Sequence, residues 1–132
     1  EFEGFRNKKF EENYVLDLFK KSILNYVMYC EINNIHLVLM TQFNNIENKS
    51  EVFLKGFSKL KNPYNVDEFI DIYSKANELI LEIAKDYSVS FIDLNKLVPK
   101  KGEYIFDSVH LTDKGSIFVS DIITNKFEEI FK

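Results

Sequence analysis

The fold is decided by one nearly unbroken apolar stretch, Ile35-His36-Leu37-Val38-Leu39-Met40-Thr41. The stretch is rich in residues that favour β-strands. Apolar runs without alternation are typical of strands that are covered on both faces, as in the parallel sheets of α/β proteins. A shorter stretch of the same kind, Val89-Ser90-Phe91-Ile92-Asp93-Leu94, lies further along the chain. We therefore expect two buried strands.

The segments around these strands carry apolar residues at helical spacing. Before the first strand, residues 10–30 predict a helix with one apolar stripe. The stripe contains Leu16, Phe19, Ile23, Val27 and Cys30 and is widened by Tyr14, Leu18 and Tyr26. Between the strands, residues 65–87 predict a helix at whose start Asn65 and Glu68 approximate a capping box. A last helix is predicted over residues 113–131.

The predicted order of helix, strand, helix, strand and helix implies right-handed crossovers and a parallel sheet. Residues 42–65 are polar and too many for a plain connection, so we expect a short helix or a flap there. This segment holds a short apolar patch of Val52, Phe53, Phe57 and Leu60. Two parallel strands alone would leave apolar strand edges unpaired. We therefore expect that further N-terminal strands are missing from this chain or are supplied by another chain.

Length and composition limit the classes of protein to consider. The 132 residues are enough for one domain, residues 1–132, and too few for two. With 45% hydrophobic and 29% charged residues, the chain has the composition of a globular protein rather than of a disordered segment. The net charge of −4 is spread without a basic stripe, which argues against nucleic-acid binding. No apolar run approaches the roughly 20 residues of a membrane-spanning helix.

The ends of the chain and its few metal-binding residue types limit the possibilities further. Residues 1–5 lack the basic start and apolar segment of a signal peptide, so no signal peptide is visible in this chain, and a cytoplasmic location is slightly favoured. Cys30 is the only cysteine, which rules out an internal disulfide and a cysteine-based zinc cluster. Its place in an apolar stripe predicts a buried, inert thiol. The two histidines, His36 and His110, are distant and have no clustered carboxylate, so no metal site is predicted.

Residues 104–115, Tyr-Ile-Phe-Asp-Ser-Val-His-Leu-Thr-Asp-Lys-Gly, carry most of the functional information. A histidine that takes a proton from a nucleophile needs a fixed tautomer, which an acceptor on its other ring nitrogen supplies. Asp107, three residues before His110, is close enough in a tight loop to be that acceptor. The pair follows a predicted strand and precedes a helix, where ligand sites of open α/β sheets gather. The competing interpretation makes Asp107 a turn residue and His110 a surface side chain.

No serine in the sequence is a convincing nucleophile. None lies in a Gly-x-Ser-x-Gly elbow, so we interpret Ser58, Ser108 and Ser116 as structural. Thr41 and Gln42 end the first strand at the same edge, where they either contact substrate or cap the following turn. Phe53 and Phe57 either line an acyl pocket or pack their segment on the core. His36 is interpreted as a packed or edge residue.

Three features together resemble a known family. They are a buried strand ending in Thr-Gln at residues 38–42, a short strand ending in Asp93, and the motif Asp107, His110, Leu111, Thr112 and Gly115. In these features the chain is similar to the C-terminal half of SGNH (GDSL-type) ester hydrolases, and the resemblance covers nearly its whole length. It implies a three-layer α/β/α domain with a flavodoxin-like parallel sheet of about five strands, of which the two present would be the fourth and fifth.

The resemblance also implies a mechanism. The family uses a serine nucleophile in a Gly-Asp-Ser turn and an oxyanion hole that includes an asparagine. This sequence has neither Gly-Asp-Ser nor Gly-x-Asn-Asp, so two roles alone carry over: His110 as general base and then acid, and Asp107 as its orienting carboxylate. The serine would come from a complementing N-terminal segment or from an oligomer partner.

The function expected from this resemblance is hydrolysis of an ester or thioester, as in acyl esterases, O-acetyl esterases and lipase-like enzymes. The substrate would be a small-molecule or carbohydrate acyl ester, and neither a metal nor an organic cofactor is required. The alternative is a non-catalytic, truncated or partner-dependent α/β domain that retains the Asp-x-x-His loop by descent. A flavodoxin-like binding domain would need a glycine-rich phosphate loop, which four scattered glycines do not provide.

Overall fold

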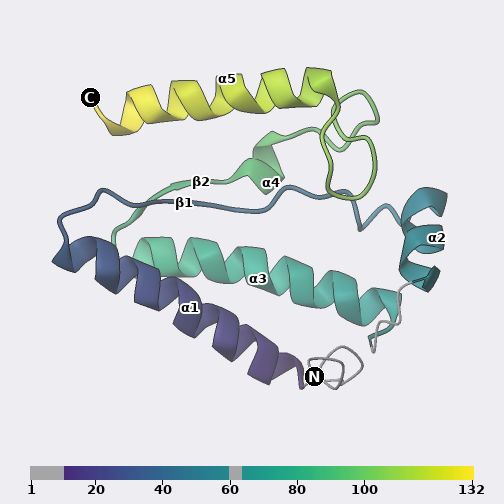
Figure 1. Ribbon diagram of the computed structural model, residues 1–132, viewed down its shortest axis with the longest axis horizontal. Helices are drawn as coiled ribbons and strands as arrows, with labels where there is room; N and C mark the ends of the chain where they lie inside the picture. The colour runs from purple at the N-terminus through teal and green to yellow at the C-terminus, as the bar shows by residue number, and fades with distance from the viewer. Residues whose placement is uncertain (1–10, 60–63) are drawn as a thin grey trace, which may run out of the picture.

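The computed structural model describes residues 11–59 and 64–132 of the chain. The elements are α1 (Glu12–Ile32), β1 (Val38–Met40), α2 (Glu51–Lys59), α3 (Val66–Asp86), β2 (Ser90–Ile92), α4 (Leu94–Leu97) and α5 (Asp113–Ile130). The predicted order of the three long helices and two strands is confirmed, and α2 is the short helix expected after the first strand (Figure 1). The expectations for residues 1–5, Phe10 and Leu60 lie outside the described residues.

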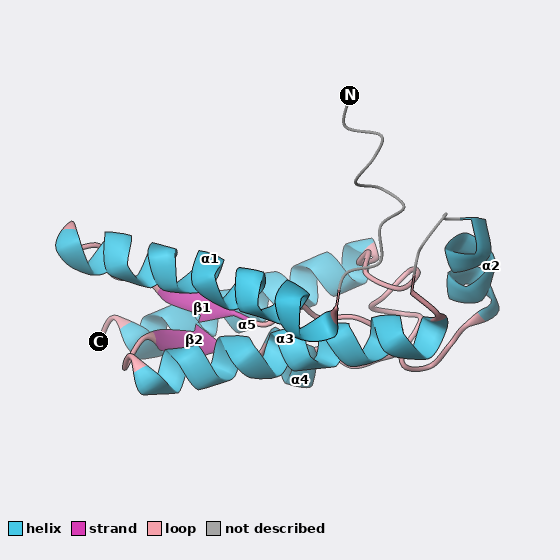
Figure 2. Ribbon diagram, turned by 90° about the horizontal axis from the view of Figure 1, so that it is seen from below, coloured by secondary structure: helices cyan, strands magenta, loops and turns pink. Residues whose placement is uncertain are grey.

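The two strands form a parallel pair with helices on both sides. Val38 lies opposite Ser90, Leu39 opposite Phe91 and Met40 opposite Ile92. Helix α5 lies on one side of the pair, and α3 and α1 lie on the other, with α1 alongside α3 (Figures 1 and 2). The C-terminal ends of both strands point toward α2 and toward the loop that precedes α5 (Figure 1).

The three-layer, flavodoxin-like parallel sheet implied by the family resemblance is wrong for this chain. Over its described residues the chain is mostly helical, and its sheet has two strands of three residues each. The physical reason is that only residues 35–41 and 89–94 offer runs of strand-forming residues. The long apolar segments elsewhere repeat at helical spacing, so they fold as α1, α3 and α5.

The starts of α3 and α5 are held by local contacts that the sequence indicates. Asn65 Oδ1 accepts the Glu68 N–H at 2.9 Å, and Glu68 Oε2 accepts the Asn65 N–H at 3.0 Å, which confirms the predicted capping box of α3. Thr112 caps α5, because its hydroxyl accepts the N–H of Gly115 at 3.0 Å. The start of α5 at Asp113 is therefore fixed directly after the Asp107–His110 loop.

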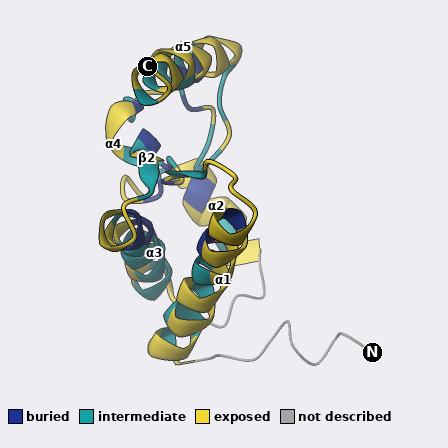
Figure 3. Ribbon diagram, turned by 90° about the vertical axis from the view of Figure 1, so that its left-hand side faces the viewer, coloured by how far each residue is buried: buried dark blue, intermediate teal, exposed yellow. Residues whose placement is uncertain are grey.

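Helix α1 packs mainly against α3. Val27 and Cys30 are buried, which confirms the predicted stripe and the buried thiol. Tyr14, Leu18 and Tyr26, expected to widen that stripe, are exposed. Because α3 is the element against which α1 packs, the contact covers a narrower strip than the sequence pattern suggests, and most of α1 is exposed in Figure 3.

The main core lies between the strand pair and α5. It consists of five buried side chains: Ile92, Leu94, Val98, Ile105 and Val119. Ile105 belongs to the loop before α5, so the core anchors that loop directly on the strand pair. Among the described residues, no helix has the length and apolar character needed to cross a membrane.

Candidate active site

The loop of Asp107 and His110 is closed at its base by backbone contacts. Ile105 and Leu111 form an isolated antiparallel bridge, and the Phe106 N–H donates to the His110 carbonyl at 2.8 Å. Ile105 is only 2% exposed, so one side of the loop is fixed in the core. Asp107 and His110 therefore lie in a short loop whose ends are fixed.

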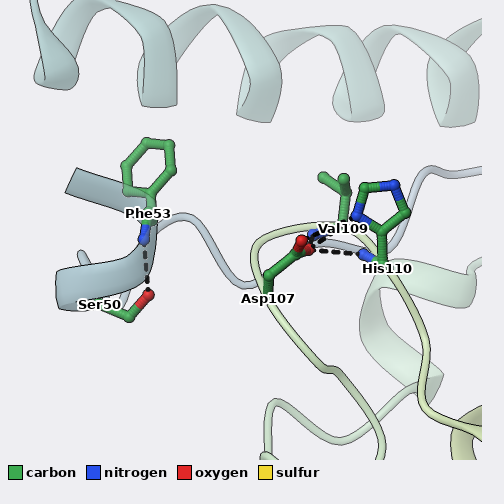
Figure 4. A network of polar contacts seen from close by, with 5 residues as sticks. All are labelled: Ser50, Phe53, Asp107, Val109 and His110. Carbon is green, nitrogen blue, oxygen red and sulfur yellow. Dashed lines mark hydrogen bonds and ion pairs between the residues drawn. The ribbon is translucent and has the colours of Figure 1, made fainter. Parts of the chain in front are cut away.

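The Asp107 carboxylate lies against the loop that it belongs to. Its Oδ1 accepts the backbone N–H groups of Val109 and His110, both at 2.9 Å. The ring Nδ1 of His110 lies 2.8 Å from Oδ2 and 3.1 Å from Oδ1 (Figure 4). An ionised carboxylate only accepts hydrogen bonds, so Nδ1 carries a proton, and in the neutral form of the ring the lone pair is on Nε2. This is the arrangement that the three-residue spacing predicts.

The ionisation of Asp107 follows from these contacts. Burial raises the pKa of the carboxyl group, but the hydrogen bonds from Val109 and His110 outweigh it and hold the pKa at about 2. The His110 side chain is 76% exposed and that of Asp107 only 25%. The imidazole of His110 is thus accessible from solvent, whereas the Asp107 carboxylate that contacts it is largely covered.

The low pKa of Asp107 has a consequence for stability at acid pH. Because the folded-state pKa is about 2 and the unfolded value is near 3.8, ionised Asp107 stabilises the fold above about pH 4, and this contribution is lost as the pH falls toward 2. We expect the free energy of unfolding of the wild type, minus that of Asp107→Asn, to fall by at most about 2 kcal/mol between pH 5 and pH 2. Urea unfolding of both proteins at four pH values measures this difference. A difference that stays constant over the range would contradict the hydrogen-bonded carboxylate.

Two of the candidate serines, Ser58 and Ser116, are bonded to backbone carbonyls and not to His110. Ser58 Oγ donates to the Lys55 carbonyl at 3.0 Å, and Ser116 Oγ donates to the Thr112 carbonyl at 3.1 Å. Both hydroxyls thus bond to the backbone of their own helix region, as structural residues do. Within the described part of the chain, no serine hydrogen-bonds to the imidazole of His110.

Thr41 holds two distant segments together. It is 2% exposed, and its hydroxyl donates to Asp93 Oδ1 at 2.8 Å and accepts the Asn95 N–H at 2.9 Å. Asp93 is the N-cap of α4, and its side chain accepts the Lys96 N–H. Thr41 and Asp93 therefore both accept backbone N–H groups in the first turn of that helix. A cap of the following turn was one of the two roles expected for Thr41. The structure shows Thr41 at the start of α4 instead. A substrate contact by Thr41 stays a prediction.

Gln42 is fixed through its backbone rather than its side chain. The buried Asn77 of α3 accepts the Gln42 N–H at 2.8 Å and donates to the Gln42 carbonyl at 2.9 Å. The Gln42 side chain is at the surface, where its amide donates to the Phe43 carbonyl at 3.3 Å. A substrate contact by this amide also stays a prediction.

A cavity of about 450 Å³ lies beside the Asp107–His110 loop. Its lining includes four aromatic side chains, Phe53 and Phe57 of α2 and Phe69 and Tyr73 of α3, and also the loop residues Asp107, Ser108 and Val109. The rings of Phe53 and Phe57 pack on α3, as the second interpretation expects, and they also line this cavity; an acyl group bound in it stays a prediction. The sequence reasoning missed Phe69 and Tyr73 as lining residues. Two aromatic pairs at i, i+4 spacing were the available signal.

His36 takes part in a contact that the sequence does not suggest. Its Nε2 lies 3.1 Å from Ser90 Oγ, and its ring packs on Phe131 with centroids 4.7 Å apart. His36 is exposed, in agreement with an edge residue. Ser90 is the first residue of β2, so His36 and Ser90 lie where the strands begin. The Asp107–His110 loop lies at the other end of the strands (Figure 1). Within residues 11–59 and 64–132, no carboxylate orients the ring of His36.

Two further observations bear on what this site can do. The described residues contain no group of three or more His, Cys, Asp or Glu side chains placed to hold a metal ion. Comparison of the chain with protein-family models, with curated protein sequences and with solved structures finds no match. The geometry of the site and the motif that the sequence carries are therefore the basis for a function.

Proposed function

We propose that this chain supplies the general base and its orienting carboxylate to a serine ester hydrolase, the activity that its resemblance to SGNH hydrolases implies. The observation that supports the proposal is the contact of Asp107 with His110. It fixes the proton on Nδ1 and leaves Nε2 free in an exposed ring. A catalytic histidine needs this tautomer to accept a proton from a hydroxyl group.

The proposed reaction has two steps. Nε2 of His110 takes the proton of a serine hydroxyl as its oxygen attacks the ester carbonyl, and His110 then gives that proton to the leaving alcohol. In the second step His110 takes a proton from water, which attacks the acyl-enzyme, and returns it to the serine. The ionised Asp107 stabilises the imidazolium ion that forms in each step. The proton moves between side chains, water and substrate, so these steps need no cofactor.

The serine is proposed to come from a segment outside residues 1–132 or from an oligomer partner. The open edge of β1 supports a complementing segment. The Thr41 N–H donates to the Ile92 carbonyl at 3.2 Å, so the alternation of a parallel strand directs the N–H and C=O groups of Met40 and Val38 away from β2. Among the described residues no strand pairs with that edge, so its backbone groups can accept another strand.

The proposed substrates are acyl esters or thioesters of small molecules or carbohydrates. The exposed His110 ring is compatible with both small-molecule and carbohydrate substrates, because the leaving alcohol or thiol can lie on the solvent side of the loop.

Serine labelling tests the proposal. The tagged chain is expressed in the cells from which its gene derives, purified gently with any segment or partner it binds, and treated with a fluorophosphonate probe. The hydrolysis of p-nitrophenyl acetate is followed in parallel. We expect hydrolysis, and a labelled serine other than Ser58, Ser108 and Ser116. The absence of both label and hydrolysis would overturn the proposal in favour of a non-catalytic domain.

A further inference from the structure

The aromatic cavity beside the Asp107–His110 loop points to the acyl group of the substrate. Its wall combines side chains of α2 and α3 with Asp107, Ser108 and Val109. Figure 4 shows Phe53 and Val109 on two sides of this space, with His110 next to Val109. A group held in the cavity thus lies next to the loop that carries the imidazole.

The lining suits a flexible hydrocarbon chain. The ring centroids of Phe53 and Phe57 are 5.6 Å apart, and those of Phe57 and Phe69 are 5.3 Å apart. The ring of Tyr73 extends this cluster, at 5.6 Å from that of Phe69. Among the described residues of the lining, Asp107 alone is charged, and its carboxylate is bound to the N–H groups and imidazole of its own loop. Cavities with walls of this kind favour apolar ligands over water.

The size of the cavity distinguishes between acyl groups. Since a water molecule takes about 30 Å³ and a methylene group a similar volume, the 450 Å³ corresponds to about fifteen such groups and easily holds a chain of about eight carbons. An acetyl group would leave most of the aromatic wall uncovered. We infer that the cavity is the acyl site of the hydrolase and that it selects medium-chain over acetyl esters. This inference rests on the proposed function.

Gly56 offers a way to fill the cavity without disturbing the fold. It lines the cavity on α2, it is exposed, and a Cβ atom built on it meets nothing within 4 Å. Gly56→Trp should therefore place its ring across the cavity. Gly102→Trp is the matched control, because Gly102 is equally open and exposed but does not line the cavity.

Binding of neutral amides tests the acyl site apart from catalysis. Isothermal titration of the purified wild type is expected to show affinity rising up to about fourfold for each added methylene group from butanamide to octanamide. Gly56→Trp should weaken octanamide binding at least tenfold, and Gly102→Trp should change it less than twofold. If the indole disturbs α2, Gly56→Leu gives the same test with a residue that favours helix.

The outcomes separate this inference from the proposed function. Affinity independent of chain length, or equal octanamide binding by the wild type and Gly56→Trp, would overturn the acyl site even if serine labelling and hydrolysis succeed. Chain-length-dependent binding in a protein that neither labels nor hydrolyses would overturn the proposed function, and with it the acyl assignment. A preference for p-nitrophenyl octanoate over acetate that is lost in Gly56→Trp would support both.

Discussion

Replacing His110 with alanine is expected to lower the rate of ester hydrolysis by about three to four orders of magnitude. The change removes the Nε2 atom that takes and returns the serine proton in the proposed reaction. The loss should fall on kcat rather than KM, because the aromatic cavity and the loop backbone remain. The His110 side chain is 76% exposed, so its removal should not unfold the chain.

His36→Ala is the matched control, because His36 is the other histidine, is exposed and also contacts a polar side chain. We expect its kcat and KM to equal those of the wild type. Asp107→Asn should lower kcat by less than His110→Ala, because the base remains and loses only its oriented partner. Steady-state kinetics of the purified complex with p-nitrophenyl esters measure all three variants. Equal rates for the wild type and His110→Ala would contradict the assigned base.

Gly115→Ala is expected to destabilise the fold by about 3 kcal/mol or more, the upper range for overpacking a closely packed site. A Cβ atom on Gly115 would lie 1.9 Å from the Tyr104 carbonyl oxygen and 2.8 Å from its carbon. That carbonyl accepts the Thr112 N–H at 3.0 Å, and the next residue, Ile105, is fixed in the core. The backbone therefore cannot move aside without opening the loop.

Chemical unfolding monitored by circular dichroism measures this effect. Gly102→Ala is the control, because its new methyl group meets nothing within 4 Å, and its free energy of unfolding should change by no more than about 0.5 kcal/mol. Since Gly115 packs against the loop that holds Asp107 and His110, hydrolysis should fall together with stability. Stability within 1 kcal/mol of the wild type would contradict the close contact between α5 and Tyr104.

Local features of the structure could be predicted from the sequence. The capping box of Asn65 and Glu68, the start of α5 and the contact between Asp107 and His110 all depend on residues three positions apart or fewer. At such separations the backbone geometry fixes which groups meet. The order of helices and strands could be predicted as well, because the apolar spacing that distinguishes a helix from a strand also involves residues close together in the sequence.

Features that depend on distant residues could not be predicted in this way. Helix α4 begins where Thr41 bonds to Asp93, 52 residues away, so its own four residues carry little signal. The apolar run predicts a first strand over residues 35–41, but the observed strand is Val38–Met40. It is shorter because β2 has three residues with which β1 can pair. The large sheet was wrong because it came from a family resemblance and not from strand-forming runs in this chain.

The hydrogen bond from the Asn45 N–H to the Ser108 carbonyl, at 2.8 Å, joins the segment that follows β1 to the Asp107–His110 loop. Ile46, the next residue, is buried and lines the aromatic cavity. The cavity wall and the histidine loop are thus tied together before any ligand arrives. In the proposed hydrolase the base would thus be ordered before the acyl chain binds, and the binding energy of that chain would serve to position the carbonyl for attack.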